Sequence, residues 1–416
     1  MVRKRCDMQE TVNSTAVEKY TLASFFAGVG GIELGFEETG EFSTVYANEF
    51  DKNARITYSE NFGKVPLDPR DIREVEAEDV PDVDIITGGF PCQAFSVAGY
   101  RKGFEDERGD LFFDLLRIIK NKNPRVIFIE NVKNMVGHDH GNTFKVIRES
   151  LVINGYHLSW DVLNSSDYGD IPQNRERIYI VGFRDLEDFE NFEFPGPIEL
   201  DTTIHDLIDY EDEKDEAFYY REGKQPFYDK VEEAITSKKI IYQWRRKYVR
   251  ENKSGLVPTL TANMGTGGHN VPIIYTDHGI RKLTPRETFN VQGYSADYRL
   301  PDLANSHLYK QAGNSVVVPV IERIANEIAF AINQHSESYQ QVEIPQNDEK
   351  YAIIYTEIHE RYSGISFVER YIDSKEELDH FIKNNISEDV PLLNNDEYIR
   401  LIKKGQSATF YMYTEM

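Results

Sequence analysis

Two apolar runs that each lead to a chemically reactive side chain constrain the fold of this chain most. The run Ile85–Gly89 leads into a turn that contains Cys92, and the run Val126–Ile129 leads directly to Glu130. Short, continuous apolar runs are typical of strands buried on both faces of a parallel sheet. Because ligands bind beyond the carboxyl ends of such strands, we expect the thiol and the carboxylic acid to reach the same small ring.

The same kind of run recurs between residues 21 and 183, in alternation with patterns of helical period. This alternation predicts βαβ units and a mostly parallel sheet, hence an α/β fold. Helices are expected over Leu111–Lys120 and Thr143–Asn154. The expected strands are Leu22–Phe26, Thr44–Asn48, Asp84–Thr87, Arg125–Ile129, Ser159–Val162 and Arg177–Gly182.

Changes in pattern divide the chain into four parts. We expect a polar N-terminal segment over residues 1–19 and a catalytic and cofactor-binding domain over residues 20–185, which residues 305–336 complete. Residues 186–304, where charged and aromatic residues mix with Pro and Gly, predict a smaller second domain. Residues 337–416 predict a small α+β appendage with strands over Tyr351–Ile358 and Ala408–Tyr413 and a helix over Glu376–Lys383.

Charge and cysteine content narrow the class of protein. The net charge of −24 disfavours a general nucleic-acid-binding surface, although basic and aromatic residues interleave over Lys238–Arg250. That stretch is equally compatible with a nucleic-acid contact and with a solvated amphipathic element. Only two cysteines, Cys6 and Cys92, are present, which favours a reducing cytoplasm over a disulfide framework. We also expect no membrane helix and no signal peptide.

A glycine cluster follows the first expected strand and begins a helix. Gly28, Gly30 and Gly31 permit a tight turn and a close approach of the backbone to a ligand. Glu49 ends the next expected strand, about 20 residues later, which is the spacing at which an acid meets ribose hydroxyls. The pattern favours a nucleotide-type cofactor, while its departure from G-x-G-x-x-G disfavours NAD. A glycine turn that serves packing alone is the alternative.

Four side chains are candidates for chemistry. Cys92 lies in a polar loop, so it could be a nucleophile or, like most lone cysteines, a buried structural residue. Glu130 follows an apolar run, so it could have a raised pKa and act as an acid, or it could be a helix-capping or ion-paired carboxylate. Arg175 and Arg177 project to one side of an extended chain, where they could orient a carbonyl oxygen or pair with acidic surface.

Together these segments resemble the bacterial DNA cytosine-5 methyltransferases of type II restriction–modification systems. The resemblance runs from about Thr21 to Gln334 and is looser in the smaller domain. It implies a Rossmann-like class I methyltransferase sheet, with residues 186–304 as the target-recognition domain. Six motifs occur in the order of that family, namely Phe26–Gly31, Gly89–Gln93, Glu130–Val132, Gln173–Arg177, Arg281–Glu287 and Gln311–Ser315.

The resemblance also implies S-adenosylmethionine as the cofactor. Glu49 would bind the ribose, Phe50 would lie against the adenine, and the returning segment would close the pocket. No metal is expected. The residues implied to bind the cofactor are Phe26, Gly28, Val29, Gly31, Glu49, Phe50, Asp71, Ile72, Gly89, Pro91, Asn314, Ser315 and Val316.

In the implied mechanism, the Cys92 thiolate attacks C6 of a cytosine that has been flipped out of duplex DNA. Glu130 would hold N3 and the exocyclic amine, Arg177 would bind O2, and Arg175 would steady the cysteine loop. The loop Phe95–Glu107 would close on the DNA as a lid. Residues implied to contact DNA are Gln93, Ser96, Arg245, Arg246, Arg250, Thr261 and Asn263.

The expected function is therefore methylation of C5 of cytosine in a specific short sequence of double-stranded DNA. The expected enzyme is a monomer that protects DNA from a cognate restriction endonuclease acting on the same site, without a stable complex between the two. Two alternatives remain: a tRNA cytosine-5 methyltransferase, and a non-catalytic nucleic-acid-binding or acidic decoy protein. The sequence identifies neither the target site nor a role for residues 337–416.

Overall fold

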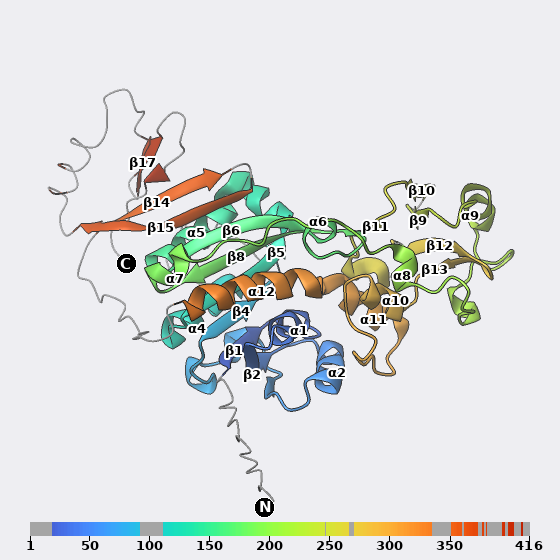
Figure 1. Ribbon diagram of the computed structural model, residues 1–416, viewed down its shortest axis with the longest axis horizontal. Coiled ribbons are helices and arrows are strands. Elements are labelled where there is room, and N and C mark those ends of the chain that lie inside the picture. The colour runs from blue at the N-terminus through green and yellow to red at the C-terminus, as the bar shows by residue number, and fades with distance from the viewer. Residues whose placement is uncertain are drawn as a thin grey trace, which may run out of the picture.

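A nine-stranded mixed sheet forms the centre of the molecule (Figure 1). The computed structural model describes residues 19–91, 111–245, 247–265, 270–334, 351–359 and 362–372, together with residues 377, 380, 393–395, 398–402 and 409–410. The strands follow the order β14-β15-β6-β8-β5-β4-β1-β2-β3. Their bounds are β1 Tyr20–Phe25, β2 Phe42–Asn48, β3 Leu67–Asp68, β4 Ile85–Gly88, β5 Val126–Val132, β6 His157–Asn164, β8 Glu176–Phe183, β14 Tyr351–His359 and β15 Ser363–Ile372.

Only one half of this sheet is parallel. Strands β3, β2, β1, β4 and β5 run in one direction. Strand β8 is antiparallel to both β5 and β6, β15 is antiparallel to β6, and β14 is antiparallel to β15. The expectation of a mostly parallel sheet was therefore wrong for the second half. The link from β6 to β8, residues 165–175, holds only a short helix and a short strand, which suits an antiparallel pair better than a parallel crossover.

Helices cover both faces of the sheet, as an α/β fold requires (Figure 1). Side chains of β5 alternate between two cores: Ile127 and Ile129 pack in the cluster that includes α4 and α5, and Val126 and Phe128 in the one that includes α1 and α12. All six expected strands and both expected helices are confirmed. The helices are α1 Gly31–Glu38, α2 Lys52–Asn61, α4 Leu111–Lys122, α5 Asn142–Ile153, α6 Ser165–Tyr168, α7 Leu186–Glu190, α8 Ile204–Leu207, α9 Tyr228–Ala234, α10 Pro285–Asn290, α11 Asn305–Asn314 and α12 Val318–Asn333.

A second, four-stranded sheet lies at the end of the molecule opposite β14 and β15 (Figure 1). Its order is β10-β9-β12-β13, and it has a core of its own around Tyr242, Trp244 and Ile273. The short strands β7 and β11 pair with each other between the two sheets. The bounds are β7 Gln173–Asn174, β9 Ile241–Trp244, β10 Val249–Asn252, β11 Val257–Pro258, β12 Pro272–Thr276 and β13 Gly279–Lys282.

The chain then returns to the first sheet. Helix α12 packs against α1, and its apolar side carries Ile321, Ile324 and Ile328 into the core beneath it. The expected strand over Tyr351–Ile358 is confirmed as β14, but the sequence did not predict that β14 and β15 join the central sheet. Most of the expected helix over Glu376–Lys383 lies outside the described residues. The last described strands are β16 Leu393–Asn395, β17 Tyr398–Ile402 and β18 Thr409–Phe410.

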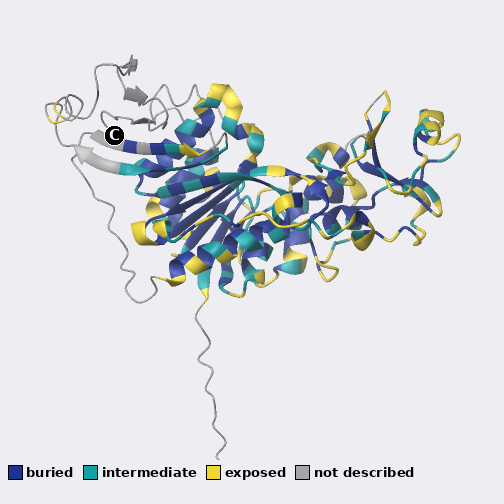
Figure 2. Cartoon of the chain, turned by 45° about the horizontal axis from the view of Figure 1, so that its top comes forward, coloured by how far each residue is buried: buried dark blue, intermediate teal, exposed yellow. Residues whose placement is uncertain are grey.

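Buried residues concentrate in the middle strands of the central sheet (Figure 2). Helix α1 also carries a buried carboxyl group with no hydrogen-bond partner among the described residues. Glu33 of α1 is fully buried, and both of its carboxyl oxygens lack a partner. Burial raises the pKa of Glu33 to about 7, above the ordinary value of 4.5. A group whose pKa is higher in the folded state destabilises the fold increasingly as pH rises between these two values.

We predict that Glu33→Gln stabilises the protein more at alkaline than at acidic pH. Removing the ionisation should raise the free energy of unfolding, by an amount that is about 2 kcal/mol larger at pH 8 than at pH 5.5. Urea denaturation at the two pH values measures the difference, with the exposed Glu78→Gln as the control. An equal effect of Glu33→Gln at both pH values would show that Glu33 is not held in its neutral form.

Candidate active site

Glu130 and Arg177 form an ion pair where two inner strands of the central sheet, β5 and β8, end and begin, respectively. Glu130 lies near the end of β5 and Arg177 near the start of β8, and the antiparallel register pairs Val132 with Arg177. The Arg177 Nε is 3.0 Å from the Glu130 Oε1, and each side chain is 12% exposed. Burial raises the pKa of Glu130, while the cations Arg177 and Arg175 oppose that rise. A carboxylic acid of this kind can deliver a proton into a partly enclosed site.

The segment that leads to Cys92 passes directly beside this pair. A side chain at Gly89 would begin 3.7 Å from the Glu130 Oε2, so the backbone and the carboxyl group are close neighbours. The Asn131 side-chain amide donates to the Phe90 carbonyl at 2.8 Å and so ties the segment to β5. Pro91 is exposed. Cys92, Gln93, Ser96 and the expected lid Phe95–Glu107 lie outside the described residues.

Arg175 holds three separate stretches of backbone together. Its Nη1 donates to the Leu260 carbonyl at 2.9 Å, and its Nη2 donates to the carbonyls of Gly313 and Ser315. Its Nε has no partner among the described residues. Burial and the neighbouring Arg177 lower the pKa of Arg175. The described contacts of Arg175 therefore join the chain just after β7 to Leu260, which follows β11. They also join it to the returning segment at Gly313 and Ser315. The cysteine loop lies outside the described residues, so the expected contact of Arg175 with it stays a prediction.

Glu49 braces the turn after β1 from the end of β2. Its Oε2 accepts the Gly28 amide at 2.8 Å and its Oε1 accepts the Asp51 amide at 2.6 Å. Gly28 has φ 58° and Phe26 has φ 57°, a left-handed conformation that is uncommon for a residue with a side chain. Such conformations cluster at functional sites. Next to Glu49, the Phe50 ring is 69% exposed, so a flat apolar surface faces outward beside a carboxylate.

Other residues implied to bind the cofactor have structural partners. A Cβ at Gly31 would lie 2.4 Å from the Tyr294 hydroxyl and 2.8 Å from Val316 Cγ2, so Gly31 allows the returning segment to pack closely. The Val29 carbonyl accepts a hydrogen bond of 2.5 Å from the Tyr298 hydroxyl. Ser315 and Val316 are buried, while Asn314 is exposed.

Asp71 and Ile72 lie beyond β3, in the segment after the Glu49 turn. The Asp71 carboxylate is bound by the Arg73 side chain at 2.6 and 2.8 Å. Ile72 is buried, with 3% of its surface exposed. Their side chains are thus engaged in the fold, and a contact with an adenine edge would fall to the backbone.

Sequence reasoning missed the residues that join the two parts of the site. Tyr294 and Tyr298 pack against the glycine turn, and the buried Gln173 bridges the Val291 carbonyl and the Leu260 amide. Gln173 is the first residue of the motif Gln173–Arg177, and its place in that motif is the signal for it in the sequence. Nothing in the sequence around Tyr294 and Tyr298 indicated a contact with a glycine turn so far away along the chain.

The basic and aromatic stretch Lys238–Arg250 does not form one interleaved surface. Tyr242 and Trp244 lie inside the core of the four-stranded sheet. The Trp244 ring stacks on the Phe227 ring, with 4.4 Å between the ring centroids. The interleaved interpretation was therefore wrong for these two aromatics, because β9 is buried on both faces. Arg245, Lys247, Tyr248 and Arg250 are exposed around the turn between β9 and β10. Arg246 lies outside the described residues.

The remaining residues implied to contact DNA lie on the neighbouring loop. Thr261 and Asn263 are exposed, and the Thr261 hydroxyl donates to the Asn263 Oδ1 at 2.6 Å. Asn270 also donates to this oxygen, at 3.1 Å, and its carbonyl accepts the Gln243 amide at 3.0 Å. These hydrogen bonds connect Thr261 and Asn263, through Asn270, to Gln243 of β9.

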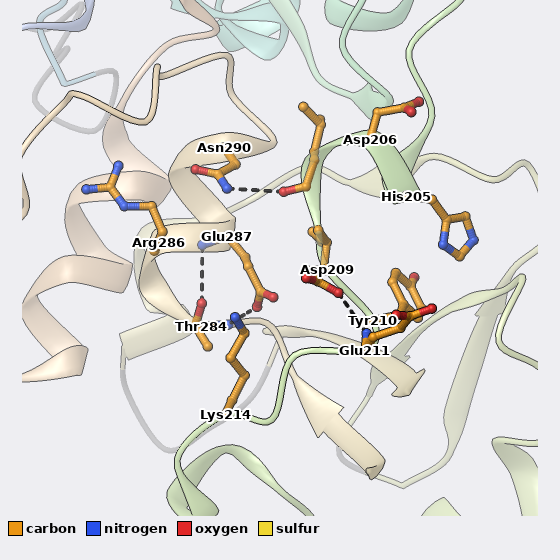
Figure 3. Close-up of a pocket in the computed structure, with 12 residues that line it drawn as sticks. His205, Asp206, Asp209, Tyr210, Glu211, Lys214, Thr284, Arg286, Glu287 and Asn290 are labelled. Atoms are coloured by element: carbon orange, nitrogen blue, oxygen red, sulfur yellow. Dashed lines mark hydrogen bonds between the residues drawn. The ribbon is translucent and has the colours of Figure 1, made fainter. Parts of the chain in front are cut away.

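A cavity of about 620 Å³ lies elsewhere, between α10 and the segment 205–214 (Figure 3). None of the predicted site residues lines it. Two of its lining residues, Thr284 and Glu287, form the capping box of α10, and Glu287 also pairs with the buried Arg281 at 2.7 Å. Thr284 and Glu287 therefore stabilise α10 and its contact with β13, and we assign the reactive site to Glu130 and Arg177 instead. No group of three or more potential metal ligands occurs among the described residues.

Comparison with known proteins identifies this arrangement. The model of the C-5 cytosine-specific DNA methylases matches residues 20–329. This chain belongs to that family. It is 66% identical over 309 residues to the type II methyltransferase M.Bsp6I of Bacillus sp. (strain RFL6), across 74% of this chain and 98% of the relative. It is 43% identical over 325 residues to M.HhaI of Haemophilus parahaemolyticus, across 74% of this chain and 94% of that one.

Solved structures share the fold of this methyltransferase at lower identity. A mutant of the Spodoptera frugiperda DNMT2 matches with a TM-score of 0.57 and 20% identity, over 74% of this chain and 99% of that one. The Entamoeba histolytica methyltransferase EhMeth matches with a TM-score of 0.56 and 18% identity, over 75% and 98%. The family match and the shared fold confirm the Rossmann-like class I methyltransferase fold. The family match and the relatives show DNA cytosine-5 methyltransferase activity, which excludes the non-catalytic alternative. Among the described helices, none combines the length and apolar character needed to cross a membrane.

We predict that Arg175→Lys destabilises this methyltransferase. A lysine ammonium is compact and cannot reach the carbonyls of Leu260, Gly313 and Ser315 with the geometry of a planar guanidinium. The free energy of unfolding should fall by about 2 kcal/mol as buried acceptors lose their donor. Chemical denaturation measures the change, with the exposed Arg250→Lys as the matched control. If both variants unfold alike, Arg175 does not hold the parts together.

Proposed function

We propose that this methyltransferase modifies cytosine through a covalent bond between Cys92 and C6, with Glu130 and Arg177 bound to the ring. The Glu130–Arg177 pair beside the segment that leads to Cys92 carries the proposal. It supplies an acid and a cation within reach of one small heterocycle. Its position at the carboxyl ends of β4 and β5 is where open sheets bind their ligands.

The residues at the neighbouring strand ends fit S-adenosylmethionine as the methyl donor. The Glu49 carboxylate, already oriented by two backbone amides, keeps lone pairs free for the two ribose hydroxyls. The exposed Phe50 ring offers an apolar face to a purine, and the left-handed turn at Phe26 and Gly28 brings backbone close to the ligand. When bound, this cofactor supplies an electrophilic methyl group.

The first chemical step makes cytosine C5 nucleophilic. The Cys92 thiolate forms a bond to C6, and the electrons of the C5–C6 double bond move through C4 to N3. Glu130 provides the proton that N3 takes up, which is consistent with the raised pKa that burial gives this carboxyl. The Arg177 guanidinium stabilises the O2 carbonyl as electron density builds on the ring.

The last step releases the enzyme. After C5 has gained its methyl group, N3 returns its proton to Glu130 and the C5 proton is lost to water. The electron pair left at C5 forms the C5–C6 double bond as the bond between Cys92 and C6 breaks, and the thiolate returns. Because these ring atoms are stacked inside duplex DNA, the cytosine must first rotate out of the helix.

The second sheet provides the surface on which the target sequence is read. The exposed Arg245 and Arg250, with Thr261 and Asn263 on the adjoining loop, are placed to contact phosphates and base edges. In this proposal the enzyme acts as a cytoplasmic monomer, because each strand is methylated in a separate event. By its likeness to type II methyltransferases, it protects a short site from a cognate restriction endonuclease, without a stable complex.

We predict that Glu49→Gln weakens binding of S-adenosylmethionine. A glutamine side chain has one carbonyl oxygen, so it cannot accept the amides of both Gly28 and Asp51. Loss of one such bond and of a charged acceptor for ribose should raise Kd about tenfold. Isothermal titration calorimetry measures this, with Glu78→Gln as the control. An unchanged Kd for Glu49→Gln would remove Glu49 from the cofactor site.

We predict that DNA containing 5-fluorocytosine traps the enzyme. Fluorine occupies the position from which a proton must leave, so the Cys92–C6 bond should persist once the methyl group has been transferred. A random-sequence duplex library carrying 5-fluorocytosine should yield a complex that survives denaturing electrophoresis with the wild type and none with Cys92→Ser. A persistent complex with Cys92→Ser would contradict the covalent mechanism. A trap formed only on fluorinated tRNA would favour the tRNA alternative.

A further inference from the structure

The strands that follow the family region bring an aromatic side chain to the rim of the active site. The family model ends at residue 329, and β14 and β15 come after it. Strand β15 pairs with β6 through Gly364, Ile365 and Ser366. Because β15 is antiparallel to β6, the turn between β14 and β15 points to the edge of the sheet that holds Glu130. Tyr362 lies in that turn.

This pair of strands is fixed in the catalytic core. Ile354 is fully buried in the core cluster that also includes α4 and α5. The hydroxyls of Thr356 and Ser366 form a buried hydrogen bond of 2.9 Å between β14 and β15. A Cβ at Gly364 would lie 2.5 Å from the Trp160 ring, so the backbone of β15 lies against the side chain of β6. The position of the turn is therefore set by packing.

A line of contacts runs from this turn to the reactive pair. The Lys133 Nζ lies 4.4 Å from the centroid of the Tyr362 ring and donates to the Glu176 Oε1 at 2.5 Å. The Glu176 carbonyl accepts from the Arg177 Nη1 at 2.9 Å, and the Arg177 Nε pairs with Glu130 at 3.0 Å. The first contacts join side chains, and the link to Arg177 passes through the backbone of Glu176 at the start of β8.

We propose that Tyr362 is a positioning residue of the active site, whose ring holds Lys133 against Glu176 and thereby fixes Arg177 beside Glu130. Lys133 and Glu176 are 27% and 44% exposed, and an ion pair in that setting is weak by itself. A cation held between a carboxylate and an aromatic face is more restricted. The restriction acts where β5 ends and β8 begins, at the pair of Val132 with Arg177. This inference rests on the roles proposed for Glu130 and Arg177.

The test is the single-turnover rate of methyl transfer to plasmid DNA, measured with the full-length enzyme in excess. Tyr362→Ala should slow the transfer about three- to tenfold, while Tyr362→Phe keeps the ring and should retain the rate. The Kd for S-adenosylmethionine and the Tm should remain unchanged in both variants. The matched control is His359→Ala, because His359 belongs to the same strand pair and its ring pairs only with Glu357 among the contacts described.

A double-mutant cycle decides whether Tyr362 acts through Lys133. The double variant Tyr362→Ala/Lys133→Ala should be no slower than Lys133→Ala alone. The proposal would be overturned if the rate losses of the two single variants multiplied in the double variant. A wild-type rate in Tyr362→Ala would also overturn it. Ser366→Ala removes the buried hydrogen bond between β14 and β15 and shows how far a loss of Tm alone lowers the transfer rate. If Tyr362→Ala lowers the rate and the Tm in the same proportion, its role is only structural and the proposal is wrong. Absence of methylation by the wild type and His359→Ala would instead contradict the proposed function.

Discussion

The ion pair between Glu130 and Arg177 is the contact on which the active site depends. It joins the end of β5 to the start of β8, and this is possible only because β8 runs antiparallel to β5. A parallel strand in that place would put Arg177 at the opposite edge of the sheet. Burial raises the pKa of Glu130, and the cations Arg177 and Arg175 oppose that rise.

Charged side chains also hold the backbone around this pair. Arg175 binds carbonyls from two separate stretches of chain, and Glu49 binds the Gly28 amide of the glycine turn and the Asp51 amide after β2. Both charges are partly or wholly buried, and removing either would leave polar backbone groups without a partner. These contacts also hold the segment that returns after the second sheet, since the carbonyls of Gly313 and Ser315 accept two of the hydrogen bonds that Arg175 donates.

Local patterns predicted much of this arrangement. Apolar runs of strand length gave β1, β2, β4, β5, β6 and β8, because strands buried on both faces leave a continuous apolar signal. Strand direction was not predictable, since the pairing of β8 with β5 depends on contacts between distant segments. The same limit hid Tyr294, Tyr298 and Tyr362, whose partners lie far away in sequence. Tyr242 and Trp244 were misassigned because a basic and aromatic pattern does not distinguish a surface from a core.

Bisulfite sequencing of plasmid DNA from cells that express this chain tests the central claim most directly. The account predicts protected cytosines in one short, recurring sequence context with the wild type, and none with Cys92→Ala or Glu130→Ala. Protected cytosines that persist in either variant would contradict the assignment of the thiol and the carboxylic acid. An absence of protected cytosines with soluble wild-type protein would contradict methylation of DNA itself.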